Sequence, residues 1–223
     1  MVGLRPVGGN PCLLAADDPR LVRSRDPLRS AARIREAELS GDRELEVRDR
    51  VLALLADHGE TLADRTTSVG HLTGSALVLD STAQRTLLML HTKLDRWLQP
   101  GGHADGDHEL AGVALKEATE ETGIVGLRVR VPAVDIDIHS VDHGDDLGEH
   151  LHLDLRFVVV APDDAVEQGN HESQELRWVT PEELDDLADE PSLVRLARRG
   201  FALGAGWTAV SPRRRGWNNS PSD

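Results

Sequence analysis

The chain has 223 residues, which is enough for one sizeable hydrophobic core with peripheral helices. Acidic residues outnumber basic ones by 39 to 25, and the net charge of −14 argues against binding to bulk nucleic acid or to a membrane surface. A single cysteine, Cys12, excludes an internal disulfide framework. No apolar run approaches the roughly 20 residues that span a bilayer, and charges interrupt the N-terminus, so we expect a cytoplasmic protein.

The N-terminal part precedes the first predicted strand. Residues 1–26 mix proline, glycine and charged residues, which predicts a flexible tail. Residues 27–66 predict a helical extension of two helices, with a break at Ser40, Gly41 and Asp42. The second helix has one apolar face, formed by Val47, Val51, Leu54 and Leu55. We expect these helices to cover the core; the alternatives are a homodimer arm or a substrate lid.

Strand patterns begin near Val69. Residues 72–79 and 86–90 predict two strands, with residues 80–84 as the turn between them. Residues 91–100 then lead to a glycine-rich turn. In this segment Arg96 is a candidate for contacting a charged substrate, whereas Trp97 is better explained as an apolar packing residue.

A short helix is predicted from about Glu109 to Gly123, a residue suited to a left-handed C-cap. Glu117, Glu120 and Glu121 stand at i, i+3 and i+4, so their carboxylates project from one face. A separate apolar stripe suits burial against a sheet: Ala111, Ala114, Leu115 and Ala118. Three carboxylates at this spacing usually form a solvated acidic face; the alternative is a site for a hard divalent cation, Mg²⁺ foremost.

Two further strands follow this helix. Residues 134–139 alternate apolar and polar side chains, residues 142–149 form a polar loop, and residues 150–160 begin as a strict alternation. The alternation puts four polar side chains on one strand face: His150, His152, Asp154 and Arg156. We interpret this face as the wall of a substrate pocket, and a histidine-based transition-metal site is the alternative.

The C-terminal part predicts a strand over residues 175–179 and a helix that starts at Thr180 with a capping box. A second short helix is expected to start at Pro191 or Ser192 and to end before Gly200. Residues 201–223 predict a loose tail.

Residues 101–124 resemble the box of the Nudix hydrolase family, which is Gly, five residues, Glu, seven residues, then Arg-Glu-apolar-x-Glu-Glu-x-Gly-apolar. Gly102 opens this pattern, and residues 116–124 close it in the same register. His108 stands where the family has the first glutamate, and Lys116 replaces the arginine. The resemblance implies a Nudix α/β/α sandwich with a mixed sheet over residues 67–200, to which the N-terminal helical extension is an addition.

The resemblance also implies the chemistry. Glu117, Glu120 and Glu121, with the Gly102 carbonyl, would hold Mg²⁺ or Mn²⁺, and water would attack phosphorus in the diphosphate linkage of a small nucleoside diphosphate derivative. The general base would be Glu120, Glu121, or Glu172 in a loop that is expected to move. We expect the substrate contacts to come from Arg96, His103, His139, His152 and Asp154.

A second function stays open, namely a Nudix domain that binds a nucleotide metabolite as a sensor or scaffold without turnover. The complete set of three box glutamates argues against this function, and the replacement of the first glutamate by His108 argues for it.

Overall fold

One mixed sheet organises the molecule, whose computed structural model describes residues 11–142 and 149–208. In this part of the chain the sheet has nine strands; β2 and β8 run parallel, and the other pairs are antiparallel. The strands are β1 (Cys12–Ala15), β2 (His71–Leu79), β3 (Thr86–His91), β4 (Trp97–Leu98), β5 (Gly101–His103), β6 (Arg128–Val131), β7 (Asp135–Asp142), β8 (Glu149–Val160) and β9 (Ser173–Val179).

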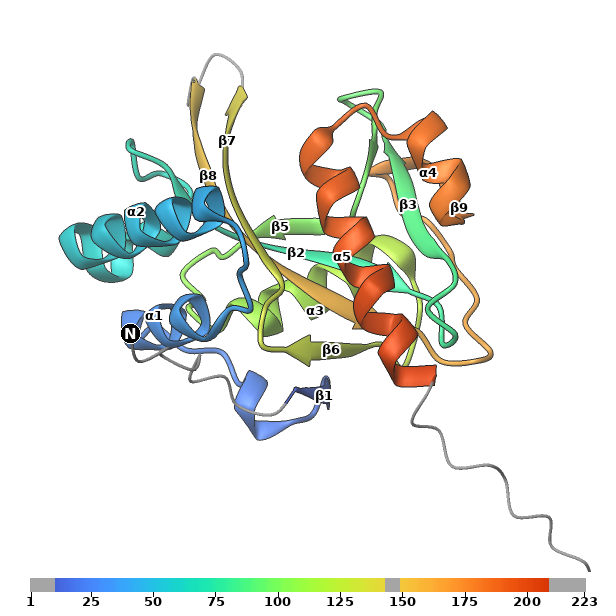
Figure 1. The fold of residues 1–223 in the computed structure, drawn as a ribbon. Helices are drawn as coiled ribbons and strands as arrows, with labels where there is room; N and C mark the ends of the chain where they lie inside the picture. The colour runs from blue at the N-terminus through green and yellow to red at the C-terminus, as the bar shows by residue number, and fades with distance from the viewer. Residues whose placement is uncertain (1–10, 143–148, 209–223) are drawn as a thin grey trace, which may run out of the picture.

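Helices cover both faces of this sheet (Figure 1). The α-helices are α1 (Pro27–Glu36), α2 (Asp42–His58), α3 (Leu110–Thr122), α4 (Pro181–Leu187) and α5 (Pro191–Thr208), and two 3-10 helices are η1 (Pro19–Leu21) and η2 (Gly59–Ala63). A Cβ on Gly74 of β2 would meet the backbone of α3, whereas Leu77 of β2 lies against Gly200 of α5. Because successive side chains of a strand point to opposite faces, α3 and α5 lie on opposite sides of β2. The predicted α/β/α sandwich with a mixed sheet is confirmed.

The hydrophobic core has two parts, one on each side of β2. Leu72, Ala76 and Val78 belong to the part that contains the apolar stripe of α3. Leu77 and Leu79 belong to the part that contains Leu193, Leu196 and Ala197 of α5. The α5 face of β2 is therefore apolar only in its second half. Its first half carries a polar row, formed by His71, Thr73 and Ser75.

The helix α3 forms as its sequence predicts. Gly123 adopts φ 66°, a left-handed conformation that favours glycine, and its N–H donates to the Thr119 carbonyl. The predicted apolar stripe is buried. The two helices of the N-terminal extension also form, on either side of the predicted break. None of the described helices is long and apolar enough to cross a membrane.

The prediction of a loose tail is wrong for residues 11–26. Cys12–Ala15 form β1, which pairs with β6, and Leu14 is fully buried. The partner strand lies far along the sequence, so the local composition of residues 11–26 carries no sign of the pairing. Residues 1–10 lie outside the described part of the chain.

The predicted end of the last helix is also wrong, because α5 continues through Gly200 and Gly204 to Thr208. A Cβ on Gly200 would lie 2.2 Å from Leu77 Cδ2, and one on Gly204 would lie 2.1 Å from Ala83 Cβ. These glycines allow close packing of the helix on the core, which outweighs their low helix propensity. Of the predicted C-terminal tail, residues 201–208 are helical and residues 209–223 lie outside the described chain, as do residues 143–148 of the predicted polar loop.

Candidate functional site

The box carboxylates lie over a glycine-rich strand. The strand β5 pairs with β2, and this register places Gly102 opposite Gly74 on the face that α3 covers. A Cβ on Gly102 would lie 2.5 Å from Glu117 Oε2. A larger residue here would displace the Glu117 carboxylate from its place beside the strand.

Glu121 is the buried member of the set, with 3% of its surface exposed. Its Oε2 accepts a hydrogen bond of 2.9 Å from the Gly101 N–H. Burial raises the pKa of Glu121 to about 8; the Gly101 N–H lowers it, and the neighbouring carboxyls of Glu172 and Glu117 raise it further. The buried carboxyl of Glu121 thus lies beside two other acidic groups.

Glu117 and Glu120 are held together by Lys116. The Lys116 Nζ lies 2.9 Å from Glu117 Oε1 and 3.1 Å from Glu120 Oε2. The Glu120 side chain is exposed, whereas that of Glu117 is mostly covered. The lysine therefore retains the neutralising charge that the family pattern provides by arginine.

The segment that carries Glu172 is attached to the C-terminal end of α3. Gln168 N–H donates to the Thr122 carbonyl at 2.7 Å, and Asn170 Nδ2 donates to the Glu120 carbonyl at 3.2 Å. Asn170 Oδ1 in turn accepts from the Glu172 N–H at 2.8 Å. The Glu172 carboxyl lies close enough to Glu121 to raise the pKa of that residue. The structure thus brings the predicted base to the box without requiring the loop to swing.

This donor set fits a divalent cation such as Mg²⁺ or Mn²⁺. The carboxyl groups of Glu117, Glu120 and Glu121 and the Gly102 carbonyl would supply only oxygen atoms, which are the ligands that hard cations prefer. The raised pKa of Glu121, caused first by burial, favours its protonated form, and a bound cation would favour the ionised form instead.

The N-terminal extension packs against the box, and this packing accounts for His108. His108 is fully buried; its Nδ1 lies 2.9 Å from Ser30 Oγ of α1, and its Nε2 lies 3.1 Å from the Glu60 carbonyl of η2. Next to it, Glu109 Oε1 accepts from Arg33 Nε at 2.7 Å. The histidine therefore fastens the extension to the box loop, which agrees with the prediction that these helices cover the core.

Five histidines from four strands meet on the other face of β2, and we call them the histidine cluster: His71, His103, His139, His150 and His152. The registers explain the meeting, because His71 pairs with His152, His139 also pairs with His152, and His103 pairs with Thr73. Since Gly102 faces α3, the neighbouring His103 points to the opposite face of β5. Three of the predicted substrate-contacting residues, His103, His139 and His152, lie in this cluster.

Asp154 belongs to a buried ion network. Its surface is 1% exposed, its carboxylate accepts hydrogen bonds from Thr73 and Ser75, and Arg156 Nε lies 2.6 Å from its Oδ2. Arg156 also lies 3.4 Å from Asp135 Oδ2 and 3.4 Å from Asp137 Oδ2. These contacts give Asp154 a structural role within the sheet. The alternation of residues 150–156 alone could not distinguish this role from a place in a pocket wall.

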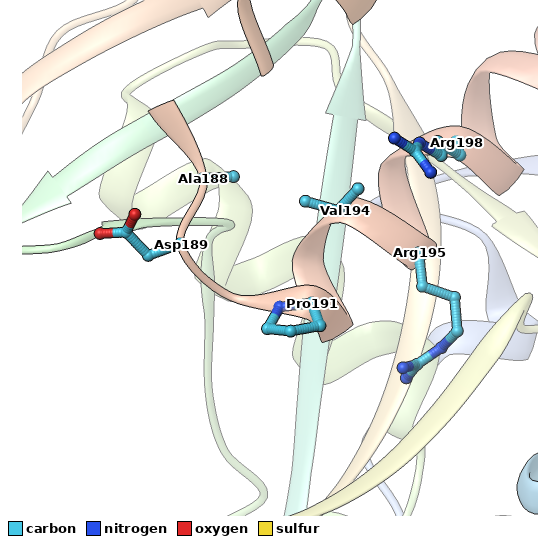
Figure 2. A pocket seen from close by; sticks show the side chains of 6 residues that line it. All are labelled: Ala188, Asp189, Pro191, Val194, Arg195 and Arg198. Atoms are coloured by element: carbon cyan, nitrogen blue, oxygen red, sulfur yellow. The ribbon is translucent and has the colours of Figure 1, made fainter. Parts of the chain in front are cut away.

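Arg96 forms an ion pair of 2.8 Å with Glu190, just before α5. A shallow pocket occupies the same end of α5, lined by Ala188, Asp189, Pro191, Val194, Arg195 and Arg198 (Figure 2). Arg195 pairs with Asp135, and Arg198 pairs with Asp185. No box residue lines the pocket, so we do not assign the chemistry to it.

Comparisons with known proteins cover the same part of the chain. The family model of the NUDIX domain matches residues 71–199. No curated protein sequence matches the chain. A hydrolase of the NUDIX family from Clostridium perfringens is 20% identical, with a TM-score of 0.45, over 60% of this chain and 97% of that one. An Ap4A hydrolase from C. elegans is 22% identical, with a TM-score of 0.43, over 60% of this chain and 98% of that one.

Proposed function

This chain belongs to the NUDIX domain family and is a Nudix-type pyrophosphohydrolase, and we propose that it cleaves the diphosphate linkage of a nucleoside diphosphate derivative with a divalent cation. The observation that carries the proposal is the convergence of Glu117, Glu120, Glu121 and Glu172 at the glycine strand. Such a concentration of acid costs stability, and it is useful where a cation must be held against phosphate.

Each residue has a part in the proposed reaction. Glu117, Glu120 and Glu121, with the Gly102 carbonyl, would hold Mg²⁺ or Mn²⁺, which when bound neutralises phosphate oxygens and lowers the pKa of water. Water attacks phosphorus, the bond from that phosphorus to the bridging oxygen breaks, and the water proton passes to a carboxylate. The products are a nucleoside monophosphate and a second phosphate-bearing fragment.

Glu172 is the proposed acceptor of that proton, because hydrogen bonds of Gln168 and Asn170 hold its segment at the end of α3, beside Glu121. A general base must be ionised to act, so kcat falls as the pH drops and the base becomes protonated. We expect Glu172→Gln to lower kcat and to flatten this acidic limb, while Mn²⁺ affinity stays almost unchanged. The measurement is the pH profile of kcat together with a Mn²⁺ titration.

The matched control is Glu175→Gln, which makes the same change on an exposed residue of the adjoining strand β9. This control should have the same kcat and the same acidic limb of the pH profile as the unmodified enzyme. An unaltered limb in Glu172→Gln would assign the base to Glu120 or Glu121 instead.

We propose that the histidine cluster contacts the part of the substrate that lies farthest from the cleaved diphosphate bond. The box lies on the α3 face of β5, so a substrate that also contacts His103, His139 and His152 would have to pass around the edge of this strand. We expect His152→Ala to raise KM, or to change substrate preference, more than it lowers Tm. Steady-state kinetics and thermal unfolding of the same preparation check this; a large fall in Tm with normal kinetics would leave His152 only a packing role.

The sensor hypothesis loses its main support in the sequence, because the histidine that replaces the first glutamate is a packing residue between the extension and the box. A panel of nucleoside diphosphate derivatives with Mg²⁺ or Mn²⁺, scored for phosphate products, separates the two functions. We expect turnover of at least one member. Tight binding of one member without turnover of any would favour the sensor.

A further inference from the structure

Three members of the histidine cluster lie close together, and their nitrogen donors differ chemically from the carboxylate oxygens of the box. Its centre is His71, whose ring centroid lies 4.8 Å from that of His103 and 4.8 Å from that of His152. The His103 and His152 centroids are 5.0 Å apart. Three imidazoles from three different strands thus point into one small volume.

The nitrogen atoms of this trio are close enough to share an ion. One ring nitrogen from each of His71, His103 and His152 lies within 4.8 Å of the other two. Zn²⁺ bonded to histidine at about 2.0–2.1 Å in tetrahedral geometry brings such nitrogens to roughly 3.4 Å from one another. Small rotations of the three rings close that difference, since their strands already fix the positions of the Cβ atoms.

We propose that His71, His103 and His152 bind a divalent transition-metal ion of the zinc class. Imidazole nitrogen suits Zn²⁺ and its neighbours in the transition series, whereas the all-oxygen donor set of the box suits Mg²⁺ or Mn²⁺. The chain would therefore hold two kinds of metal on the two faces of the β2–β5 ladder.

Burial and strand pairing favour a defined site over a chance gathering of surface histidines. His71 is fully buried, and His103 and His152 are partly covered. His71 and His152 are direct partners in the parallel β2–β8 ladder, which extends over the whole of β2. Ligands on such a ladder keep their spacing, because moving one of them requires breaking the pairing of the sheet.

Three histidine ligands leave one position of a tetrahedral ion open. Such an open position is typical of zinc that binds water or a substrate, whereas structural zinc is closed by four protein ligands. The remaining two histidines adjoin members of the trio, with His150 4.7 Å from His71 and His139 5.4 Å from His152, measured between ring centroids. Water or an oxygen anion such as phosphate can occupy such a position.

Cobalt substitution tests the proposal without relying on activity. Co²⁺ in a tetrahedral or five-coordinate histidine site absorbs visible light strongly, whereas six-coordinate Co²⁺ among carboxylates and water absorbs weakly. We expect the metal-free protein to take up one equivalent of Co²⁺ with strong absorption, and added Zn²⁺ to remove that absorption by displacing the cobalt.

The variants are chosen to separate the two metal sites. His103→Ala and His152→Ala should each weaken Co²⁺ binding by more than about 100-fold, since losing even an outer-shell partner of a ligand costs about 10–100-fold. Glu120→Gln should keep the strong absorption, because it alters only the box. The matched control is His171→Ala, which removes a side chain that is 88% exposed and should bind like the unmodified protein.

Two results would overturn the proposal. One is the absence of strong visible absorption when Co²⁺ is added to the unmodified protein, which would mean that the histidine rings only contact one another. This measurement does not depend on the folding of any variant. The other is undiminished binding by both His103→Ala and His152→Ala. Failure of the hydrolase proposal is a separate result, since the panel of diphosphate substrates and the Glu120→Gln variant measure that activity.

Discussion

Replacing Glu120 with glutamine is expected to lower kcat by about 10²-fold or more, comparable to the loss of a major electrostatic stabiliser of a transition state. The substitution keeps the shape of the side chain and removes one charge from the box. Because the Glu120 side chain is exposed and its described ion pair is with Lys116, the fold should survive. The measurement is kcat against Mg²⁺ concentration, with circular dichroism to verify folding.

The control for this variant is Glu182→Gln, the same change on an exposed glutamate in the first turn of α4. It should leave kcat and the Mg²⁺ dependence unaltered. If Glu120→Gln itself were fully active and showed the normal response to Mg²⁺, Glu120 would not be a metal ligand.

Replacing Arg156 with methionine is expected to reduce the free energy of unfolding by about 3–5 kcal/mol, the usual cost of removing one partner from a buried ion pair. The guanidinium is almost fully buried and contacts Asp135, Asp137 and Asp154. Methionine keeps much of the volume but leaves these carboxylates without that charge, although Arg195 still lies 3.0 Å from Asp135. Urea unfolding followed by circular dichroism measures the change.

The control is Arg198→Met, which breaks an exposed ion pair of 2.9 Å with Asp185. Exposed pairs contribute about 0–1 kcal/mol, so this variant should unfold nearly as the unmodified protein does. Equal effects of the two substitutions would show that the network around Arg156 does not hold the sheet together.

The sequence predicts most reliably those features that depend on residues a few positions apart. The helix over residues 110–122 could be predicted from its glutamate spacing, its apolar stripe and Gly123, because each of these acts within a few turns. The alternation of residues 150–156 correctly placed four polar side chains on one face of a strand. The three box glutamates identified the candidate metal site from spacing and family pattern together.

The sequence predictions that were wrong concern features that depend on contacts between distant segments. No local pattern shows that Cys12–Ala15 pair with β6. Nor does a local pattern show that Gly200 and Gly204 allow α5 to pack closely on the core and do not end the helix. The role of His108 required its partners Ser30 and Glu60, which come from the extension. Likewise, the alternation within one strand could not show that Asp154 belongs to a buried ion network and His152 to the histidine cluster. The neighbouring strands supply the partners of both residues.

The central claim is that the box glutamates support attack of water on phosphorus. Hydrolysis of the best substrate of the panel in ¹⁸O-enriched water, followed by phosphorus NMR of the products, tests it most directly. We predict a nucleoside monophosphate and a second phosphate-bearing product, one of them labelled with ¹⁸O on phosphorus, formed by the unmodified protein with Mg²⁺ and almost not at all by Glu120→Gln. Unlabelled phosphates, or equal rates for the two proteins, would contradict the claim.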